Sequence, residues 1–462
     1  MNKEIKVMTF NKKMKKSIIL FLALTLCVNF IYPQEKRLTN ETEIEKAERM
    51  QWWTNDRFGM FIHWGLYALP ARHEWVKQSE RLTTEQYQKY FEEFNPVNYD
   101  PVKWAKNAKK AGMKYAVLTS KHHEGFCLFD SKYTDYKATN TMANRDLAKE
   151  FVDAFRAEGL KVGFYYSLID WHHPDFTIDR VHPQRTDSQS DYVSMNEGKD
   201  MDRYRTYLHN QVREILTNYG KIDILWLDFS YPGENGKGRD DWNSIELIKM
   251  ARELQPGIII DNRADLNDYV DGYDFETPEQ VSPAQLAAYK GKYWETCQTF
   301  SGSWGYYRDE TSWKTHRQLL DLLITSTANG GNLLLNVGPT AKGEFDYRAN
   351  EALNELGYWM DAHSESIYNC TYAPDEFKLP DNINARLTYN PTERKLYLHL
   401  FDYPSSGIVT LSNYGEKIKY VQLLNDYSEI IYKQTNNNRD ITLTLPKVKP
   451  PYEVVVIELI LK

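Results

Sequence analysis

The feature that most constrains the fold of this chain is a series of short apolar runs, each ending at a residue able to take part in chemistry. Apolar runs of about four to eight residues, separated by helical patterns, are typical of buried parallel strands. Six of them lead directly into His, Lys, Tyr, Asp, Arg or Glu side chains: Phe58–Ile62, Tyr115–Leu118, Val162–Tyr165, Ile222–Leu227, Ile258–Ile260 and the weaker Tyr273–Phe275. The active site of a parallel α/β barrel lies at the carboxyl ends of its strands, so we expect these side chains to converge on one pocket.

Amphipathic helices separate most of these runs. Tyr204, Leu208, Val212 and Ile215, for example, recur at helical spacing before Gly220. Two further runs, Tyr293–Thr296 and Asn332–Val337, raise the number of strand candidates to eight. Eight strands in β–α alternation predict a (β/α)₈ barrel rather than an open sheet. No clear helix separates the sixth and seventh runs, so we expect the barrel to be irregular there.

The pattern changes from about Tyr372 onward. Short alternating segments follow, punctuated by Asn, Gly and Pro: Lys395–Phe401, Ile408–Leu411, Lys419–Leu424, Glu429–Tyr432, Ile441–Leu445 and Glu453–Ile460. Such segments are typical of an antiparallel β-sandwich. We therefore expect a catalytic (β/α)₈-like barrel over residues 35–371 and a C-terminal sandwich over residues 372–462.

The first 34 residues have the layout of a secretory signal peptide. Four lysines between positions 12 and 16 precede the apolar run Ile18–Val28, which is too short to span a bilayer. We expect cleavage near Gln34 and a secreted or periplasmic protein. Lipid attachment at Cys27 is the less favoured alternative, because the residue before it is not small.

Charge and cysteine content exclude several function classes. Removing the first 34 residues takes away six lysines and one glutamate, so a formal charge of −7 becomes −12. An acidic surface argues against nucleic acids and anionic membranes as partners. The three remaining cysteines contain no CxxC pair, which predicts neither a disulfide framework nor a zinc site. The sequence gives no indication of the oligomeric state.

Asp228 is the strongest candidate for a catalytic residue. It ends the run Ile222–Leu227 with no basic residue near it in the sequence, and it could either cap the next turn or act as a nucleophile. Its best partner is Glu279, with Glu276 and Glu295 as competing candidates. Two carboxyl groups held in opposite protonation states are the minimum needed to cleave a glycosidic bond.

The adjacent His122 and His123 suggest either a metal site or a sugar-binding site. Neighbouring residues on a strand point to opposite sides, and no HExxH motif is present, so we expect no metal and no cofactor. Imidazoles can instead donate hydrogen bonds to sugar hydroxyls and accept them. The same role suits His63, Glu74, Arg263 and Tyr166, although each is also compatible with a hydrogen-bonded polar residue in the core.

Several of these segments resemble the α-L-fucosidases of glycoside hydrolase family 29. The resemblance covers about residues 45 to 370, and the combination of FIHWG with KHHxGF is highly specific. It rests on Phe58–Gly65 with Glu74-Trp75, Lys121–Phe126, Tyr165–Ser167, Leu225–Asp228, Trp294-Glu295, Trp304–Tyr306 and Asn332–Pro339.

The resemblance implies a retaining exo-α-L-fucosidase that acts on terminal fucosyl residues of oligosaccharides or glycoconjugates. The family nucleophile falls on Asp228, and the acid/base, whose position varies across the family, falls on Glu279. Trp304 matches an aromatic residue near the methyl group of the sugar. The remaining sugar-binding residues of the family fall on His63, Glu74, His122, His123, Tyr166, Trp226 and Arg263.

Two other function classes remain open: a sugar-binding barrel without catalysis, and a barrel hydrolase for another sugar, such as a β-galactoside or an arabinoside. The presence of both carboxylates and of the whole set of polar sugar-binding candidates favours the fucosidase.

Overall fold

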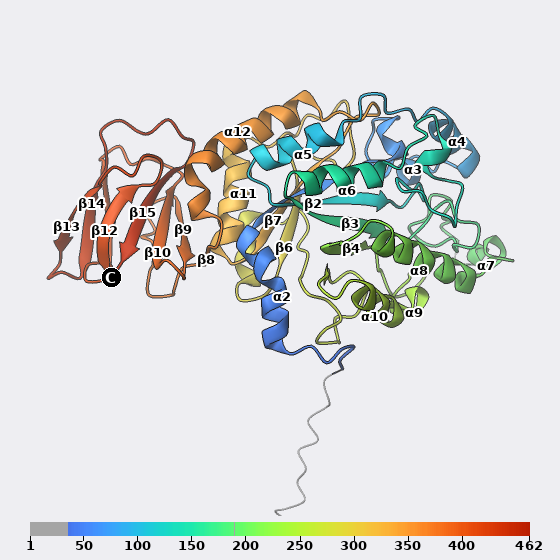
Figure 1. Cartoon of the computed structure of the whole chain (residues 1–462), viewed down its shortest axis with the longest axis horizontal. Coiled ribbons are helices and arrows are strands. Elements are labelled where there is room, and N and C mark those ends of the chain that lie inside the picture. Colours follow the sequence, from blue (N-terminus) through green and yellow to red (C-terminus); the bar gives the residue numbers. More distant parts are fainter. Residues whose placement is uncertain (1–35, 189) are drawn as a thin grey trace, which may run out of the picture.

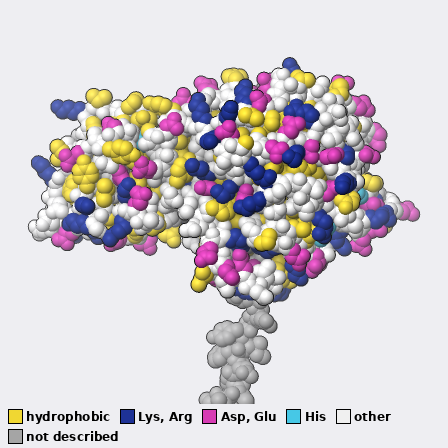
Figure 2. Space-filling model, viewed as in Figure 1, with side chains coloured by type: hydrophobic (Ala, Val, Ile, Leu, Met, Phe, Trp, Pro, Cys, Tyr) yellow, Lys and Arg dark blue, Asp and Glu magenta, His cyan; other side chains and the backbone are white. Residues whose placement is uncertain are grey.

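The computed structural model describes residues 36–188 and 190–462. The predicted signal peptide lies outside the described residues. None of the described helices is long and apolar enough to cross a membrane. On the face shown in Figure 2, acidic and basic side chains are interspersed.

A curved parallel sheet forms the centre of the larger, N-terminal part (Figure 1). Within the described residues, seven strands pair in the order β5-β4-β3-β2-β1-β7-β6. Their bounds are β1 (Phe58–Ile62), β2 (Tyr115–Lys121), β3 (Lys161–Ser167), β4 (Ile224–Asp228), β5 (Ile259–Ile260), β6 (Glu295–Thr299) and β7 (Asn332–Val337). All neighbouring strands in this sheet are parallel, which confirms the predicted (β/α) architecture.

The prediction of Tyr273–Phe275 as the sixth of eight strands was wrong. This segment instead joins β5 to β6 through isolated bridges, in which Phe275 pairs with Asp261, Glu276 with Trp294, and Glu279 with Cys297. Pro278 has no N–H group to donate to a ladder. A seven-residue 3₁₀ helix, Pro283–Tyr289, stands where a regular barrel would have an α-helix. The barrel is thus irregular at the predicted place.

Helices follow the strands and cover the outside of the sheet. α8 shows how the sequence forms them: Asp200 caps its first turn, and the predicted residues Tyr204, Leu208, Val212 and Ile215 are all buried. The helices are α2 (Glu43–Asp56), α3 (Val76–Ser79), α4 (Thr84–Glu92), α5 (Pro101–Lys110), α6 (Leu147–Ala157), α7 (Asp191–Met195), α8 (Met201–Thr217), α9 (Arg239–Trp242), α10 (Ser244–Leu254), α11 (His316–Ala328) and α12 (Tyr347–His363).

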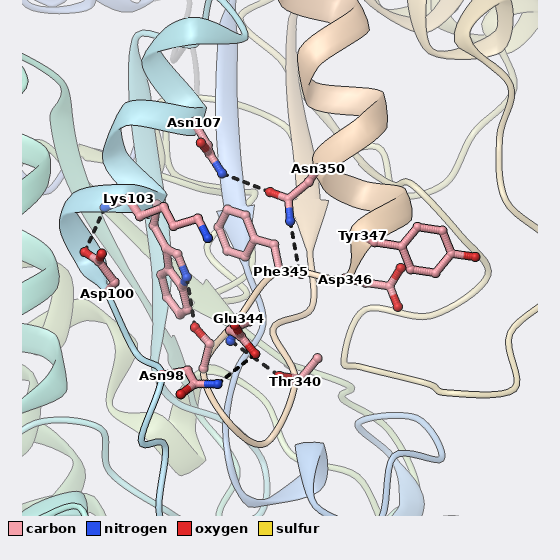
Figure 3. A pocket seen from close by; sticks show the side chains of 12 residues that line it. Asn98, Asp100, Lys103, Asn107, Thr340, Glu344, Phe345, Asp346, Tyr347 and Asn350 are labelled. Atoms are coloured by element: carbon pink, nitrogen blue, oxygen red, sulfur yellow. Dashed lines mark hydrogen bonds between the residues drawn. The ribbon is translucent and has the colours of Figure 1, made fainter.

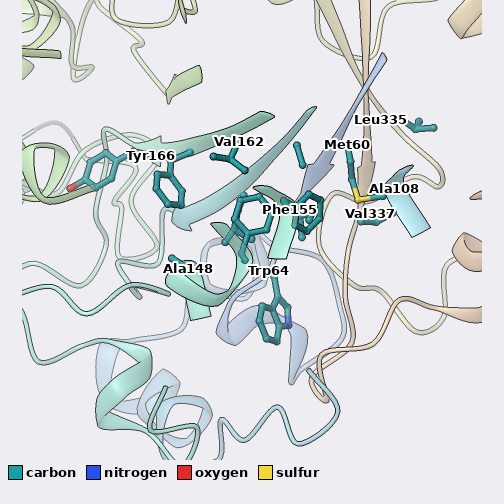
Figure 4. Packing of buried hydrophobic residues seen from close by; sticks show 14 of the residues in the cluster. Met60, Trp64, Ala108, Ala148, Phe155, Val162, Tyr166, Leu335 and Val337 are labelled. Carbon is teal, nitrogen blue, oxygen red and sulfur yellow. The ribbon is translucent and has the colours of Figure 1, made fainter. Parts of the chain in front are cut away.

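Alternate residues of each strand face two different cores. One set packs between the sheet and the helices, where Met60 and Val162 lie near Ala108 and Phe155 (Figure 4). The other set fills the inside of the barrel and includes Phe61, Tyr115, Tyr165 and Trp226, and Phe275 packs against it. The parity of a residue along its strand therefore decides whether its side chain can reach the barrel interior.

Two antiparallel sheets form the C-terminal part, as predicted. One has the order β12-β15-β10-β9-β8 and the other β11-β14-β13. Their bounds are β8 (Thr371–Tyr372), β9 (Ala385–Asn390), β10 (Lys395–Leu400), β11 (Ile408–Leu411), β12 (Ile418–Leu423), β13 (Ile431–Thr435), β14 (Asp440–Thr444) and β15 (Val455–Leu461). The sheets enclose a separate apolar core. Helix α11 packs between this part and the barrel (Figure 1).

Candidate active site

Nine of the ten predicted site residues line one pocket at the carboxyl ends of the barrel strands. His63 follows β1, His122 and His123 follow β2, Asp228 ends β4, and Arg263 follows β5. Glu74, Trp226, Glu279 and Trp304 complete this set. Residues as far apart in the chain as His63 and Trp304 thus meet in one place, as the strand-end pattern predicts.

Asp228 lines this pocket and accepts hydrogen bonds from two side chains. Arg263 Nη1 donates to its Oδ1 over 2.9 Å, and the Tyr165 hydroxyl donates to its Oδ2 over 2.7 Å. Burial raises the pKa of Asp228, while the Arg263 guanidinium opposes that shift. Both donors stabilise the ionised carboxylate, which is the form that a nucleophile requires.

Arg263 connects the two predicted catalytic carboxyl groups. Its Nη2 donates to Glu279 Oε2 over 2.7 Å, while its Nη1 holds Asp228. Its Nε donates to Thr277 Oγ1 over 2.9 Å, and its guanidinium lies 4.6 Å from the centre of the Trp226 ring. A single rigid guanidinium therefore fixes Asp228 and Glu279 as neighbours.

The other two acid/base candidates lie elsewhere. Glu276 accepts a hydrogen bond from Lys292 Nζ (2.9 Å) and does not line the pocket. Glu295 is fully buried in the barrel interior, where it accepts hydrogen bonds from Tyr115 and from Trp53. Burial raises the pKa of Glu295 to about 7. Of the three glutamates, Glu279 is the one that borders both the pocket and the solvent.

The pocket histidines are neutral, and their hydrogen bonds define the tautomers of two of them. Burial lowers the pKa of His63 to about 3 and holds the pKa values of His122 and His123 well below 6.5. His63 Nδ1 lies 2.7 Å from Asn336 Oδ1, which can only accept. His123 Nδ1 faces Ser167 Oγ, whose own hydrogen goes to the Ile169 carbonyl. In both rings Nδ1 therefore donates, and Nε2 is free to accept.

Glu74 holds the turn that carries Trp304. Its buried Oε2 accepts hydrogen bonds from Gly305 N (2.9 Å) and Ser303 Oγ (3.3 Å), the two residues that flank Trp304. The Trp304 ring lies 5.1 Å from the His63 ring, and Asn336 Nδ2 donates to the Trp304 carbonyl. Glu74 and Asn336 thus position an aromatic wall of the pocket from two sides.

The prediction of Tyr166 as a pocket residue differs from the structure. Tyr166 packs in the core between the sheet and the helices (Figure 4), and its hydroxyl donates to Gln211 on α8 over 2.8 Å. Its neighbour Tyr165 lines the pocket instead and bonds to Asp228. The physical reason is the alternation of side chains along β3, which sends adjacent residues to opposite faces.

Besides Tyr165, four residues that were not predicted line the pocket: Phe61, Trp75, Phe229 and Cys297. The alternation of side chains along β1 predicts Phe61, because it lies two residues before His63 and therefore on the same face of the strand. Phe229 follows Asp228 with a φ of +84°, and its ring packs against Trp75 and His123. Such a backbone conformation is costly for a bulky residue and has no sequence signal.

A different cavity, of about 310 Å³, lies between α5 and α12 (Figure 3). None of the predicted site residues lines it. Its amide groups largely bond within the protein: Asn107 donates to Asn350, Asn350 donates to the Phe345 carbonyl, and Asn98 donates to Glu344. Over residues 36–188 and 190–462, no group of three His, Cys, Asp or Glu side chains could hold a metal ion.

Comparisons with known proteins agree with this geometry. Residues 27–365 match the family model described as alpha-L-fucosidase. The structure of alpha-L-fucosidase isoenzyme 1 from Paenibacillus thiaminolyticus is 46% identical, with a TM-score of 0.82, over 90% of this chain and 99% of that one. The family 29 alpha-L-fucosidase from Bacteroides thetaiotaomicron is 30% identical, with a TM-score of 0.79, over 93% of this chain and 98% of that one.

Two further relatives bear on the reaction. A structure from Bacteroides thetaiotaomicron, 29% identical with a TM-score of 0.79 over 93% of this chain and 99% of that one, is a trapped covalent intermediate in complex with 2-fluoro-fucosyl fluoride. The alpha-L-fucosidase of Dictyostelium discoideum is 28% identical over 431 residues, which is 87% of each chain.

Proposed function

Since the chain belongs to the α-L-fucosidases of glycoside hydrolase family 29 and is a retaining enzyme, we propose that it removes terminal α-L-fucosyl residues from glycans, with Asp228 as nucleophile and Glu279 as acid/base. The observation that carries this assignment is the Arg263 guanidinium, which holds both carboxyl groups at one pocket.

In the first step, the ionised Asp228 attacks C1 of the fucosyl group and forms a covalent fucosyl-enzyme. Glu279 protonates the glycosidic oxygen as it leaves. In the second step, Glu279 removes a proton from a water molecule, which attacks C1 and releases α-L-fucose. This double displacement requires two carboxyl groups about 5 Å apart, one on either side of the anomeric carbon. A single arginine binding both groups supports such a spacing.

The pocket walls match the chemistry of a 6-deoxysugar. The Nε2 atoms of His63 and His123 accept hydrogen bonds from sugar hydroxyls, because neither ring is charged. Phe61, Trp226 and Trp304 provide apolar surface for the methyl group and for the C–H faces of the ring. A sugar with a hydroxyl at C6 would bury that hydroxyl against carbon, at a cost of about 1–3 kcal/mol.

We propose that residues 1–34 direct export to the periplasm or the exterior. The support is the lysine-rich start followed by a short apolar run. Fucosylated oligosaccharides and glycoconjugates outside the cytoplasm are then the natural substrates. Detection of a mature N-terminus near Gln34 in the exported protein would support this proposal, and an intact leader on active cytoplasmic protein would contradict it.

The test of function is hydrolysis of a panel of aryl glycosides by the purified protein, followed by proton NMR of the first product formed. We expect turnover of the α-L-fucoside, about tenfold to a hundredfold slower turnover of the α-L-galactoside, which adds only a 6-hydroxyl, and release of α-L-fucose before mutarotation. Preference for a sugar with a 6-hydroxyl, or initial release of β-L-fucose, would contradict the proposal.

A further inference from the structure

We propose that Gln280 is a positioning residue for the acid step: it holds the backbone of the preceding Glu279 in place while that side chain carries its proton. This inference rests on the proposed function, in which Glu279 is the acid/base. Glu279 lies outside the helices and strands, on the segment between β5 and β6, and its side chain is 41% exposed. A side chain in such a place keeps one position only if the contacts around it fix the backbone.

The ion pair between Glu279 and Arg263 is weakest during this step. Arg263 Nη2 donates to Glu279 Oε2 over 2.7 Å, and a guanidinium binds an ionised carboxylate more strongly than a neutral carboxyl group. Until the leaving oxygen is protonated, however, Glu279 must hold a proton and is neutral. Contacts that do not depend on the charge of Glu279 must therefore keep it in position, and the neighbouring backbone provides them.

Gln280 joins the backbone beside Glu279 to strand β6 at two points. Its own N–H donates to the Cys297 carbonyl over 3.1 Å, next to the bridge that pairs Glu279 with Cys297. Its side-chain Nε2 donates to Thr299 Oγ1 over 2.9 Å. Cys297 and Thr299 are buried residues of the same strand, so both hydrogen bonds end on a rigid part of the barrel.

The side chain of Thr299 is oriented to accept this hydrogen bond. Its hydroxyl donates to the Ser301 carbonyl, so its oxygen faces Gln280 with a lone pair. Lys314 Nζ donates to the Thr299 carbonyl over 2.7 Å and lies 3.4 Å from the same hydroxyl oxygen. From position 280, only a side chain of the right length with a hydrogen to donate can bind this oxygen.

The backbone of Gln280 is held in an uncommon conformation. Its φ is +52°, in the left-handed region that bulky residues rarely adopt. Such a conformation persists only where surrounding contacts over-determine it. Here the two bonds to β6 are joined by a third, from the buried Gln298 Nε2 to the carbonyl of Val281 over 2.8 Å. These bonds fix the chain after Glu279, while Pro278, whose ring restricts φ, stiffens the chain before it.

The experiment measures how the rate depends on the need for protonation. The substrates are α-L-fucosyl fluoride, whose leaving group departs without a proton, and aryl α-L-fucosides whose phenols range from acidic to weakly acidic. Gln280→Met keeps the length of the side chain and removes its N–H groups. Gln285→Met is the matched control, because Gln285 is an exposed glutamine of the same segment whose amide oxygen bonds to Ser282 rather than to β6.

We expect Gln280→Met to lower kcat/KM for phenyl α-L-fucoside about threefold to tenfold, the loss of one hydrogen bond. Hydrolysis of the fluoride should stay within about twofold, so the plot of log kcat/KM against the pKa of the phenol becomes steeper. A merely destabilised protein would lose the same factor on every substrate. Gln285→Met should give the slope of the unmodified protein.

Rates for Gln280→Met that are unchanged, or lowered equally on all substrates, would overturn the role of Gln280. A steeper plot for Gln285→Met would also overturn it, because the effect would then belong to the segment as a whole. Glu279→Ala distinguishes these results from a failure of the proposed function. If that variant shows no selective loss on phenyl α-L-fucoside, Glu279 is not the acid/base.

Discussion

At the scale of single residues, Arg263 organises the site. Its two Nη atoms bind Asp228 and Glu279, its Nε binds Thr277, and its face lies against Trp226. The positive charge stabilises the ionised nucleophile while leaving Glu279 partly exposed to solvent, where it can exchange a proton with water. One side chain thus binds both carboxyl groups, of which the reaction requires Asp228 to be ionised and Glu279 to donate a proton.

Replacing Glu279 with alanine separates the role of the acid from that of the nucleophile. We expect kcat/KM for fucosylated oligosaccharides to fall by about 10²–10⁴, because a sugar is a poor leaving group without protonation. Substrates with good leaving groups, such as fucosyl fluoride, should lose much less. The measurement is steady-state kinetics on both substrate types.

The matched control is Glu276→Ala, which removes a carboxylate that binds Lys292 outside the pocket. It should leave both substrates unaffected. Equal losses on both substrate types in Glu279→Ala, or a selective loss on oligosaccharides in Glu276→Ala, would move the acid role away from Glu279.

At the scale of elements, the alternation of side chains along β3 decides which tyrosine acts on the reaction. Tyr165→Phe removes a hydrogen bond to Asp228, so we expect kcat to fall about tenfold to a hundredfold. The ascending limb of the pH–rate profile should also move to higher pH, because a donor that lowers the pKa of Asp228 is lost.

Tyr166→Phe is the partner variant, since it removes the neighbouring hydroxyl on the opposite face of the same strand. It breaks the bond to Gln211 and should cost about 1 kcal/mol of stability with kcat unchanged. Thermal denaturation and kinetics on both proteins check the pair. A kinetic defect in Tyr166→Phe with none in Tyr165→Phe would reverse the assignment.

The same alternation explains what the sequence could and could not predict. Strand ends were readable because buried parallel strands are apolar and stop at polar residues, as at Asp228. The face of each residue was less readable in β3, because Tyr165 and Tyr166 have the same side chain. The segment around Phe275 has the apolar character of a strand but forms only isolated bridges. Phe229 lines the pocket with its backbone at a positive φ, a conformation that no residue pattern predicts.

At the scale of the whole molecule, a buried carboxyl group makes stability depend on pH. Burial raises the pKa of Glu295 to about 7, from 4.5 in a solvated glutamate. The folded state therefore retains a proton that the unfolded state has lost, and stability falls as pH rises from 4.5 to 7. The loss from this one group is up to about 3 kcal/mol.

Glu295→Gln keeps a neutral acceptor for Tyr115 and Trp53, so it should flatten the pH dependence of the melting temperature between pH 5 and pH 8. Burial also raises the pKa of Glu124 to about 7. The melting temperature of Glu295→Gln should therefore still fall as pH rises, but less steeply. The control Glu276→Gln should follow the unmodified protein. Parallel curves for Glu295→Gln and the unmodified protein would show that Glu295 is ionised in the fold.

Trapping the covalent intermediate tests the assignment of Asp228 as the nucleophile. The protein should be incubated with 2-fluoro-fucosyl fluoride, whose fluorine slows release of the fucosyl-enzyme, then digested and analysed by tandem mass spectrometry. We predict a single fucosyl-type adduct on the peptide that contains Asp228, with fragment ions placing the label on that carboxylate. A label on Glu279 or on any other residue, or steady turnover with no adduct, would contradict Asp228 as the nucleophile.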